Sequence, residues 1–466
     1  EILIVADCSG RRARNVCEPL AQRRVRSLSV DQLESVFPAW NAKVLVQLDS
    51  VVVSLEPKTL EDLHPDQLLQ NLPLLRELQD SRRDLDSPLA AQRLTTLLGK
   101  TASESSAGNT AIEAMLQTTP AQSKLGGADG EPSADTLSRL LGAPPSAVSR
   151  EGSTPRAAPP QSSVAAAHAD VQRLIRGIVG DTGAVRPPSS ATTALGEAAD
   201  FELGRLLRKL LSSPAFRALE ATWHGIDGLV RSCPDDELIR YAVVDASAAE
   251  IAADASGFAA LLRARRPSVV LLDDHVAATA EGIQALLSVL RTCAAQGTIL
   301  VTGASSEWAS VANFAGYEPG DGEVAPPVAA RAAWEELSRA RTSGAQLALA
   351  LPRYLLRQPY GKWGEPLDRL AFEEIIAENH EAFAWGNGAY LAARALAVRH
   401  AGAGAHLDGG IDLREMPVVR LPDEGGFRLQ PSTESWLSER AVERLRAAGF
   451  AVLQGIRDTD RIRVHV

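Results

Sequence analysis

The pattern of hydrophobic positions divides the chain into two regions that predict globular structure and one that does not. Residues 1–98 and 199–466 carry recurrent apolar runs, whereas Ser, Ala, Gly, Pro and Thr dominate residues 99–198. No Phe, Trp or Tyr occurs between Trp40 and Phe201. Without large apolar side chains, the middle segment cannot offset the entropy lost on ordering. We therefore expect residues 99–198 to be a low-complexity linker between two domains.

The first region mixes strand and helix patterns. The sequence "EILIVADCSG" (1–10) is an apolar run that ends in polar, Gly-containing residues, which predicts a buried strand followed by a turn. Residues 43–57 alternate apolar and polar positions and predict one or two strands. In residues 64–85 the leucines recur at helical spacing. Pro65 suits a first helical turn, and Pro73 should break or restart the helix.

The third region begins with two helical patterns separated by a break at residues 212–214. Two predicted strands follow, at 239–247 and 267–275. A helix at 281–297 leads to a third strand at 298–303. A strand, a helix and a strand in that order are typical of a parallel pair in an α/β layer.

The C-terminal part predicts one more helix and a strand pair. Residues 436–450 have a helical pattern closed by Gly449 in the C-cap region. Strand patterns follow at 450–456 and 461–466. The predicted fold class is therefore α/β in a mixed α+β form, with two such domains joined by a long linker.

Three short amphipathic segments interrupt the linker, at 110–118, 134–142 and 169–180. Isolated helices of this length are marginally stable in water. They are therefore either helical ligands for a partner protein or lids on a neighbouring domain.

Composition narrows the class of protein. The net charge of -10 lacks the basic excess of a nucleic-acid binder. The cysteines at 8, 17, 233 and 293 have neither zinc-site nor redox spacing, which favours a reducing cytoplasm. We expect no membrane insertion and no signal peptide, because no apolar run approaches the length of a span. The sequence starts at Glu1 rather than Met, so whether further sequence precedes it stays open.

Two glycine motifs fail as nucleotide-binding loops. "GKT" at 99–101 would need a glycine at position 94, which is Leu94. "GAGAHL" at 402–407 ends in Leu407, where a dinucleotide loop has glycine. We therefore expect no cofactor.

An enzymatic hypothesis rests on Asp273, Asp274 and His275. They end a predicted strand, where α/β folds place ligands, so the carboxylates could hold magnesium or a small molecule. The alternative is a solvated loop in which an aspartate caps the next helix.

A second cluster contains Glu373, Glu374, Glu378, His380 and Glu381. These residue types can bind a metal ion. The alternative is an acidic, solvent-exposed face, and we favour no metal site.

The stretch "ALPRYLLRQPYG" (350–361) places Arg353 and Arg357 four residues apart. The two arginines suggest either an anion clamp or an architectural segment. Pro352 and Pro359 would limit any helix here to about two turns.

Several segments of residues 199–466 together resemble the large subunit of the type VI secretion contractile sheath, the TssC or VipB family. The family patterns are "PxFQxLExxWRGL", "LxxPRFLLRxPYG", "FxxEE…WGNxAY", "DLPVH" and "PTEVLLTDRxxxxLxxxGFxPL". The matching segments here, in the same order, are "SPAFRALEATWHGI", "LALPRYLLRQPYG", "LAFEE" with "AWGNGAYLAAR", "EMPVVRL", and "STESWLSERAVERLRAAGFAVLQGIRDTD".

Residues 1–98 are similar to the small sheath subunit, the TssB or VipA family. "ILIVADCSG", "EPLAQRRVRSLSVDQL" and "VSLEPKTLEDLHPDQLLQNLPLLRELQDSR" carry that resemblance. The matching positions are Pro19, Leu20, Asp31, Leu60, Asp62, Pro65, Pro73 and Leu74. The chain thus looks like a fusion of small and large sheath subunits.

The resemblance implies a structural protein rather than an enzyme. Such subunits stack in helical rings around an inner tube (Hcp-like), attach to a baseplate, and contract in the bacterial cytoplasm. A ClpV-like unfoldase then dismantles the sheath by gripping an amphipathic helix. Its candidate equivalent here is Ala111, Ile112, Met115 and Leu116. Candidate structural and interface residues are Trp223, Arg353, Tyr354, Arg357, Pro359, Tyr360, Glu373, Glu374, Trp385 and Asn387.

Three departures from the family pattern change the expectation. The family's "FGGxPxG" stretch is absent, and His224 replaces the arginine of "WRGL". Large sheath subunits also continue into a C-terminal domain beyond the position that corresponds to Val466. An alternative role is therefore a short accessory or cap subunit that assembles with full-length sheath proteins. With Glu373 and Glu374 as candidate carboxylate partners, Arg353 and Arg357 are expected to hold architecture rather than a ligand.

Overall fold

The computed structural model describes residues 1–98, except 15, 17, 21–22, 86 and 88. It also describes residues 189–466, except 234–237, 310, 312, 316, 318–326, 377–378, 402–409 and 424–425. The predicted amphipathic segments, including Ala111 to Leu116, lie outside these residues. Residues 1–84 and 199–466 form one compact unit, and residues 85–198 form another. The first of these units contains the main sheet.

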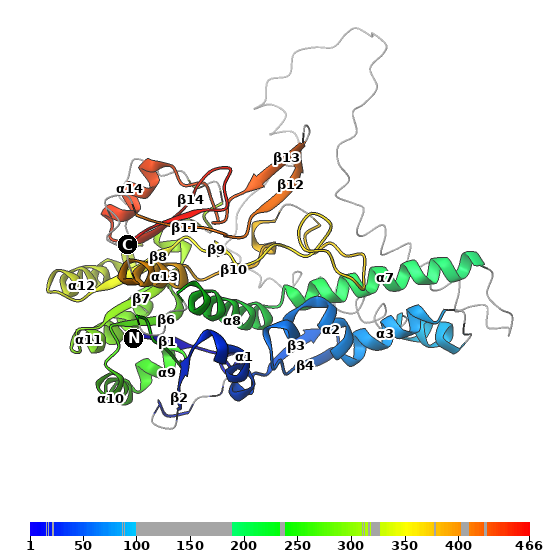
Figure 1. The fold of residues 1–466 in the computed structure, drawn as a ribbon, viewed down its shortest axis with the longest axis horizontal. Helices are drawn as coiled ribbons and strands as arrows, with labels where there is room; N and C mark the ends of the chain where they lie inside the picture. Colours follow the sequence, from blue (N-terminus) through cyan, green and yellow to red (C-terminus); the bar gives the residue numbers. More distant parts are fainter. Residues whose placement is uncertain are drawn as a thin grey trace, which may run out of the picture. The chain divides into compact units, whose positions relative to one another are not determined.

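A nine-stranded mixed sheet forms the centre of this unit (Figure 1). Its strands, in spatial order, are β11 (Ile411–Leu413), β15 (Ile462–His465), β14 (Ala451–Gly455), β8 (Leu347–Leu351), β7 (Ile299–Ala304), β6 (Val269–Val276), β1 (Ile2–Ala6), β5 (Tyr241–Asp245) and β2 (Val25–Leu28). Three two-stranded pairs lie outside it. They are β3 (Val44–Leu48) with β4 (Val51–Leu55), β9 (Tyr354–Leu355) with β10 (Trp385–Gly386), and β12 (Val419–Asp423) with β13 (Gly426–Gln430).

Strand β1 lies inside the sheet, between two strands that come much later in the chain. Ile2 pairs with Tyr241 of β5 and with Val269 of β6, both in parallel register. All five residues of β1 are buried, as expected for a strand covered on both faces. The two globular regions predicted from the sequence therefore contribute to one sheet instead of building two separate cores.

The α-helices that accompany these strands are α1 (Leu33–Val36), α2 (Pro65–Asn71), α3 (Pro73–Arg83), α7 (Ser189–Leu211), α8 (Pro214–Ser232), α9 (Ala248–Ala253), α10 (Ala255–Arg265), α11 (Ala280–Ala294), α12 (Arg331–Thr342), α13 (Gly388–Ala401) and α14 (Glu439–Ala447). None of them is both long and apolar enough to cross a membrane.

The sheet has a different set of helices on each face. Side chains alternate across a strand, so Leu3 and Val270 point into a large core with α9, α10, α11, α12 and α14. Helix α13 packs directly against strands β6, β7 and β8. Helix α8 in turn packs against α13 and β3. This arrangement sets α8 beside the segment that follows β8.

Local sequence signals explain most element boundaries. Helices α2 and α3 begin at Pro65 and Pro73, and α8 begins at Pro214, as predicted. After α14, Gly449 adopts a φ of 91°, which a glycine tolerates without strain. The predicted strands at 239–247, 267–275 and 298–303 are also present, as β5, β6 and β7.

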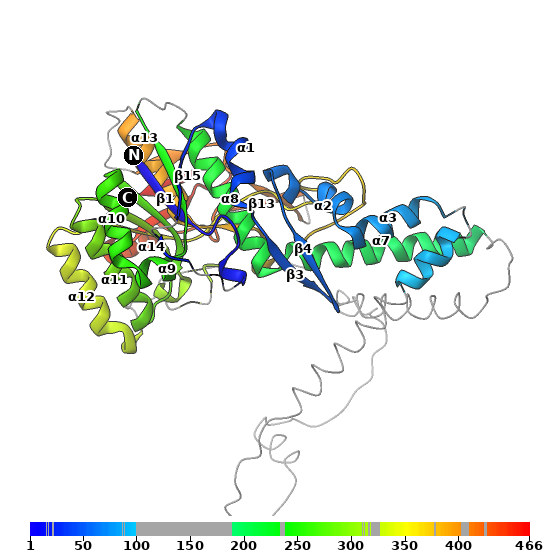
Figure 2. The ribbon, with the colours of Figure 1, turned by 90° about the horizontal axis from the view of Figure 1, so that it is seen from below.

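Helix α3 runs alongside the C-terminal part of α7 (Figure 2). Arg82 and Asp200 form a two-bond ion pair, with both distances 2.9 Å. This pair links the first described part of the chain, residues 1–98, to the second, which begins at residue 189.

Two glycines of α8 give a matched test of packing. A Cβ at Gly225 would lie 2.5 Å from Cε2 of Tyr390, whereas a Cβ at Gly228 would meet nothing within 4 Å. We expect Gly225→Ala to lower the free energy of unfolding by about 1–3 kcal/mol through overpacking. Gly228→Ala should raise it by roughly 0.5–1 kcal/mol, because alanine favours the helix. Urea unfolding of both variants checks this, and equal effects would contradict the packing of α8 on α13.

Candidate functional site

The "PRYLLRQPYG" segment leaves the end of β8 and crosses the interior. It contains β9, whose Leu355 pairs with Trp385 of β10 in an antiparallel bridge. Tyr354, Leu355, Leu356 and Tyr360 are buried. No helix forms here. The segment is instead held by short strand pairing and by its two arginines.

Arg357 is at the centre of a buried ion-pair cluster. Its Nε donates to Glu220 of α8 at 2.7 Å. Its Nη1 and Nη2 donate to the two carboxylate oxygens of Glu374 at 2.8 and 3.1 Å. The guanidinium carbon also lies 4.0 Å from the ring centroid of Tyr360. Bidentate geometry of this kind makes strong, directional pairs.

Burial determines what this cluster contributes. Arg357 is 8% exposed and Glu220 is 1% exposed. Burial disfavours the charged arginine, but the two carboxylates outweigh it and the pKa of Arg357 is raised. Burial also raises the pKa of Tyr360, whose hydroxyl therefore stays neutral. One oxygen of Glu220, Oε2, is buried without a hydrogen-bond partner. Removing the arginine would leave two buried carboxylates without a cation, which is costly.

Arg353 forms a second, less buried cluster. Its backbone N–H and Nε donate to the two oxygens of Glu434, at 2.8 and 2.9 Å. Its Nη1 and Nη2 reach Glu381 at 3.2 and 3.0 Å. His380 lies 3.1 Å from Glu434, and the Trp385 ring centroid lies 5.8 Å from the guanidinium. The segment is thereby tied to the residues before β10 and before α14.

The sequence hypothesis of one acidic metal cluster does not match this geometry. Glu374 belongs to the Arg357 cluster, while Glu381 belongs to the Arg353 cluster. Glu373 instead accepts a hydrogen bond from the backbone N–H of Lys362, and Glu378 lies outside the described residues. His380, Glu381 and Glu434 do lie close enough to hold a metal ion. Arg353, however, already forms ion pairs with Glu381 and Glu434.

The Arg353 cluster gives a pH prediction. Burial alone would raise the pKa of Glu434, but hydrogen bonds from His380 and Arg353 outweigh it and hold the pKa below its ordinary 4.5. A carboxyl with a lowered folded-state pKa stabilises the fold above its unfolded pKa. That stabilisation is lost as pH falls through the folded value. We expect the free energy of unfolding to fall below about pH 4.5, and Glu434→Gln to flatten that slope. Urea unfolding across acidic pH tests this, and identical slopes would contradict it.

Three other candidate residues have structural contacts. Trp223 is fully buried, stacks on Phe37 at 4.8 Å and donates its indole N–H to the carbonyl of Cys8 at 2.9 Å. Trp385 donates to the carbonyl of His380 at 2.8 Å. Asn387 accepts from the backbone N–H of Ala389 at 2.9 Å, at the start of α13.

Asp273, Asp274 and His275 lie near the carboxyl end of β6, at a register shift, where the enzymatic hypothesis placed them. The alternative, a solvated loop after the strand, is wrong. Neither aspartate caps the next helix, because Thr279 caps α11 by accepting from Gly282. Asp273 accepts hydrogen bonds from Thr222, Asn387 and Tyr390 at 2.7, 3.0 and 3.0 Å. These bonds join β6 to α8 and α13.

Sequence reasoning missed the two partners that matter most, Glu220 and Glu434. Both occur inside the quoted resemblance segments, in "ALEATW" and "STESW". Each is 5% exposed or less, and a charged residue at a predicted core position is itself a signal of a buried partner.

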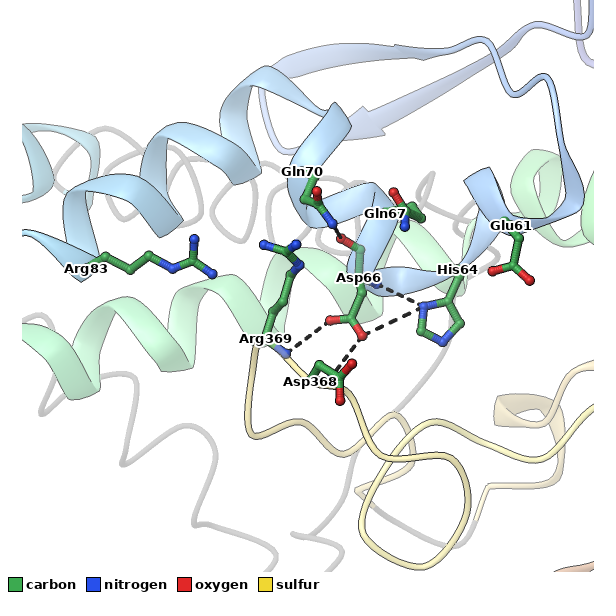
Figure 3. A pocket seen from close by; sticks show the side chains of 8 residues that line it. All are labelled: Glu61, His64, Asp66, Gln67, Gln70, Arg83, Asp368 and Arg369. Carbon is green, nitrogen blue, oxygen red and sulfur yellow. Dashed lines mark hydrogen bonds and ion pairs between the residues drawn. The ribbon is translucent and has the colours of Figure 1, made fainter.

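A polar cavity of about 520 Å³ lies where α2 meets the loop around Asp368 (Figure 3). The carboxylate of Asp66 accepts from the backbone N–H groups of Asp368 and Arg369, both at 3.1 Å. Arg83 and Arg369 line the cavity together with acidic side chains, including Glu61. Because both basic and acidic side chains line the cavity, we interpret it as the place where α2 is attached to that loop rather than as a ligand site.

Comparison with known proteins agrees with the resemblance to the large sheath subunit. Residues 266–465 match the family model described as VipB, EvpB/VC_A0108, tail sheath N-terminal domain. The chain is also 24% identical over 294 residues to the type VI secretion system sheath protein TssC1 of Pseudomonas aeruginosa. That alignment covers 56% of this chain and 58% of the relative, so this chain spans little more than half of that protein's length. These matches confirm the predicted resemblance for the large-subunit part.

Proposed function

We propose that this chain is a structural subunit of a type VI secretion contractile sheath. The observation that carries the proposal is the match of residues 266–465 to the tail sheath family. That span contains β6, β7 and β8, the arginines Arg353 and Arg357, and the β14–β15 pair. Everything found around the two arginines holds elements together, which supports an architectural role over a catalytic one.

We further propose that residues 1–98 take the place of the small sheath subunit, fused to the large one. The support is that β1 and β2 complete a sheet whose other strands come from residues 241–465. If the small and large subunits were separate chains, the small one would have to add its strands to the sheet of the large one. A fusion would fix the ratio of small to large subunits at one to one.

The partners follow from this proposal. They are other sheath subunits, an Hcp-like inner tube and a baseplate, all in the bacterial cytoplasm. A ClpV-like unfoldase would grip the segment from Ala111 to Leu116. Deleting residues 110–118 should then weaken capture by the unfoldase without changing the unfolding transition.

Electron cryo-microscopy of the purified chain tests the sheath proposal, alone and mixed with full-length sheath subunits. Tubes or rings formed by the chain alone would identify it as a core subunit. Incorporation only alongside full-length subunits would identify it as an accessory or cap. If it forms no assembly and does not incorporate, the sheath proposal is wrong.

A further inference from the structure

A groove separate from both arginine clusters lies at the carboxyl ends of β1 and β6. It encloses about 380 Å³. Its apolar wall is one side of α8 and includes Ala215, Ala218 and Leu219. Its polar end carries the carboxylates of Asp7, Asp273 and Asp274. Crevices at the carboxyl ends of parallel strands are where open α/β sheets usually bind ligands.

The carboxylates at this end lack matching positive charge. Asp273 is held by a hydroxyl, an amide and a phenol, which are all neutral donors. Asp7 accepts from the backbone N–H groups of Arg11 and Arg12, both at 2.8 Å. Of the three, Asp274 forms an ion pair with a described residue, Arg12, at 3.5 Å, and the Arg12 side chain is 55% exposed. The described side chains that line the groove therefore carry more negative than positive charge.

Several carboxylates elsewhere in the unit do have an arginine partner. Glu220 and Glu374 both pair with Arg357, Glu434 pairs with Arg353, and Glu250 pairs with Arg23. The uncompensated charge also affects the neighbours of Asp273. Burial, and then the charge of Asp273, raise the pKa of Tyr390.

We propose that this groove is a docking site for a lysine or arginine side chain of a basic partner protein. The aliphatic stem of such a side chain would lie along the alanines of α8, and its charged end would reach the carboxylates. Because the net charge of this chain is -10, a basic protein is the partner with complementary charge. The proposal does not depend on sheath assembly.

The test measures binding of two short peptides to the purified full chain by calorimetry. Acetyl-Gly-Lys-Gly-amide supplies the charged side chain, and the same peptide with norleucine keeps the stem without the charge. We expect the norleucine peptide to bind at least roughly tenfold more weakly, since one charge-assisted hydrogen bond accounts for that ratio. Asp274→Asn should weaken the lysine peptide only. Ala218→Leu should block both peptides, because Ala218 is exposed and its enlargement fills the groove without disturbing the core.

Asp412→Asn is the matched control, since Asp412 already pairs with Arg463 away from the groove. It should leave both affinities unchanged. Equal binding of the two peptides, binding that survives Ala218→Leu, or no saturable binding at millimolar concentrations would each overturn the proposal. Displacement of the lysine peptide by magnesium chloride, but not by sodium chloride of equal ionic strength, would assign the carboxylates to a metal ion and overturn it as well.

Discussion

Arg357→Ala should lower the free energy of unfolding by about 3–5 kcal/mol, the range for breaking a buried ion pair by removing one partner. The reason is that Glu220 and Glu374 would both stay buried without the guanidinium that forms their ion pairs. Urea unfolding followed by far-ultraviolet circular dichroism measures the change. A loss of this size is a large fraction of the stability of an ordinary domain, so the variant should also express poorly.

Arg463→Ala is the control for the Arg357 variant. Its pair with Asp412 is solvent-exposed, with side chains 39% and 31% exposed, and exposed pairs contribute about 0–1 kcal/mol. Adding Glu220→Gln to Arg357→Ala should recover part of the loss, because one uncompensated charge is removed. If the two arginine variants lose similar stability, the cluster around Arg357 is not the structural centre that its burial indicates.

Trp223→Ala should cost about 3–5 kcal/mol, the range for removing a large buried aromatic side chain. Trp223 projects from α8 and packs against residues 1–84. It stacks on Phe37, and its N–H reaches the carbonyl of Cys8. Its loss should therefore loosen residues 1–84 as well as α8. Hydrogen exchange would show this as faster exchange in β3 and around Phe37.

Two further variants separate the effect of the lost side-chain volume from the effect of where the tryptophan lies. Trp223→Phe keeps most of the apolar volume but loses the hydrogen bond to Cys8, so its cost should be intermediate. Trp363→Ala removes a tryptophan that is 45% exposed, and it should cost less than about 1 kcal/mol. Exchange that stays unchanged in residues 1–84 of Trp223→Ala would contradict the coupling of the two regions.

Most elements could be predicted from the sequence because their signals are local. Pro65, Pro73 and Pro214 start helices through a fixed φ and a missing N–H, whatever the rest of the chain does. The run at 2–6 is apolar at every position, which indicates a strand covered on both faces. The confirmed sheath resemblance rests on such short segments read in order.

The position of β1 and the partners of the arginines depend on contacts distant in sequence. Arg357 and Glu220 are 137 positions apart, and Arg353 and Glu434 are 81 apart. No periodicity relates such residues, so the sequence suggested the nearby Glu373 and Glu374 as partners. Of these two, only the Glu374 carboxylate contacts an arginine side chain among the described residues.

The position of β1 between β5 and β6 has a consequence for synthesis. Its two neighbours in the sheet, β5 and β6, are translated about 240 residues and more after it. At roughly 5–20 residues per second, the ribosome needs on the order of tens of seconds to supply them. Throughout that interval a strand of apolar residues, Ile2–Ala6, has neither partner and offers both edges to other chains. The yield of folded protein should therefore depend on chaperones that shield the nascent N-terminal segment until residue 276 has left the ribosome.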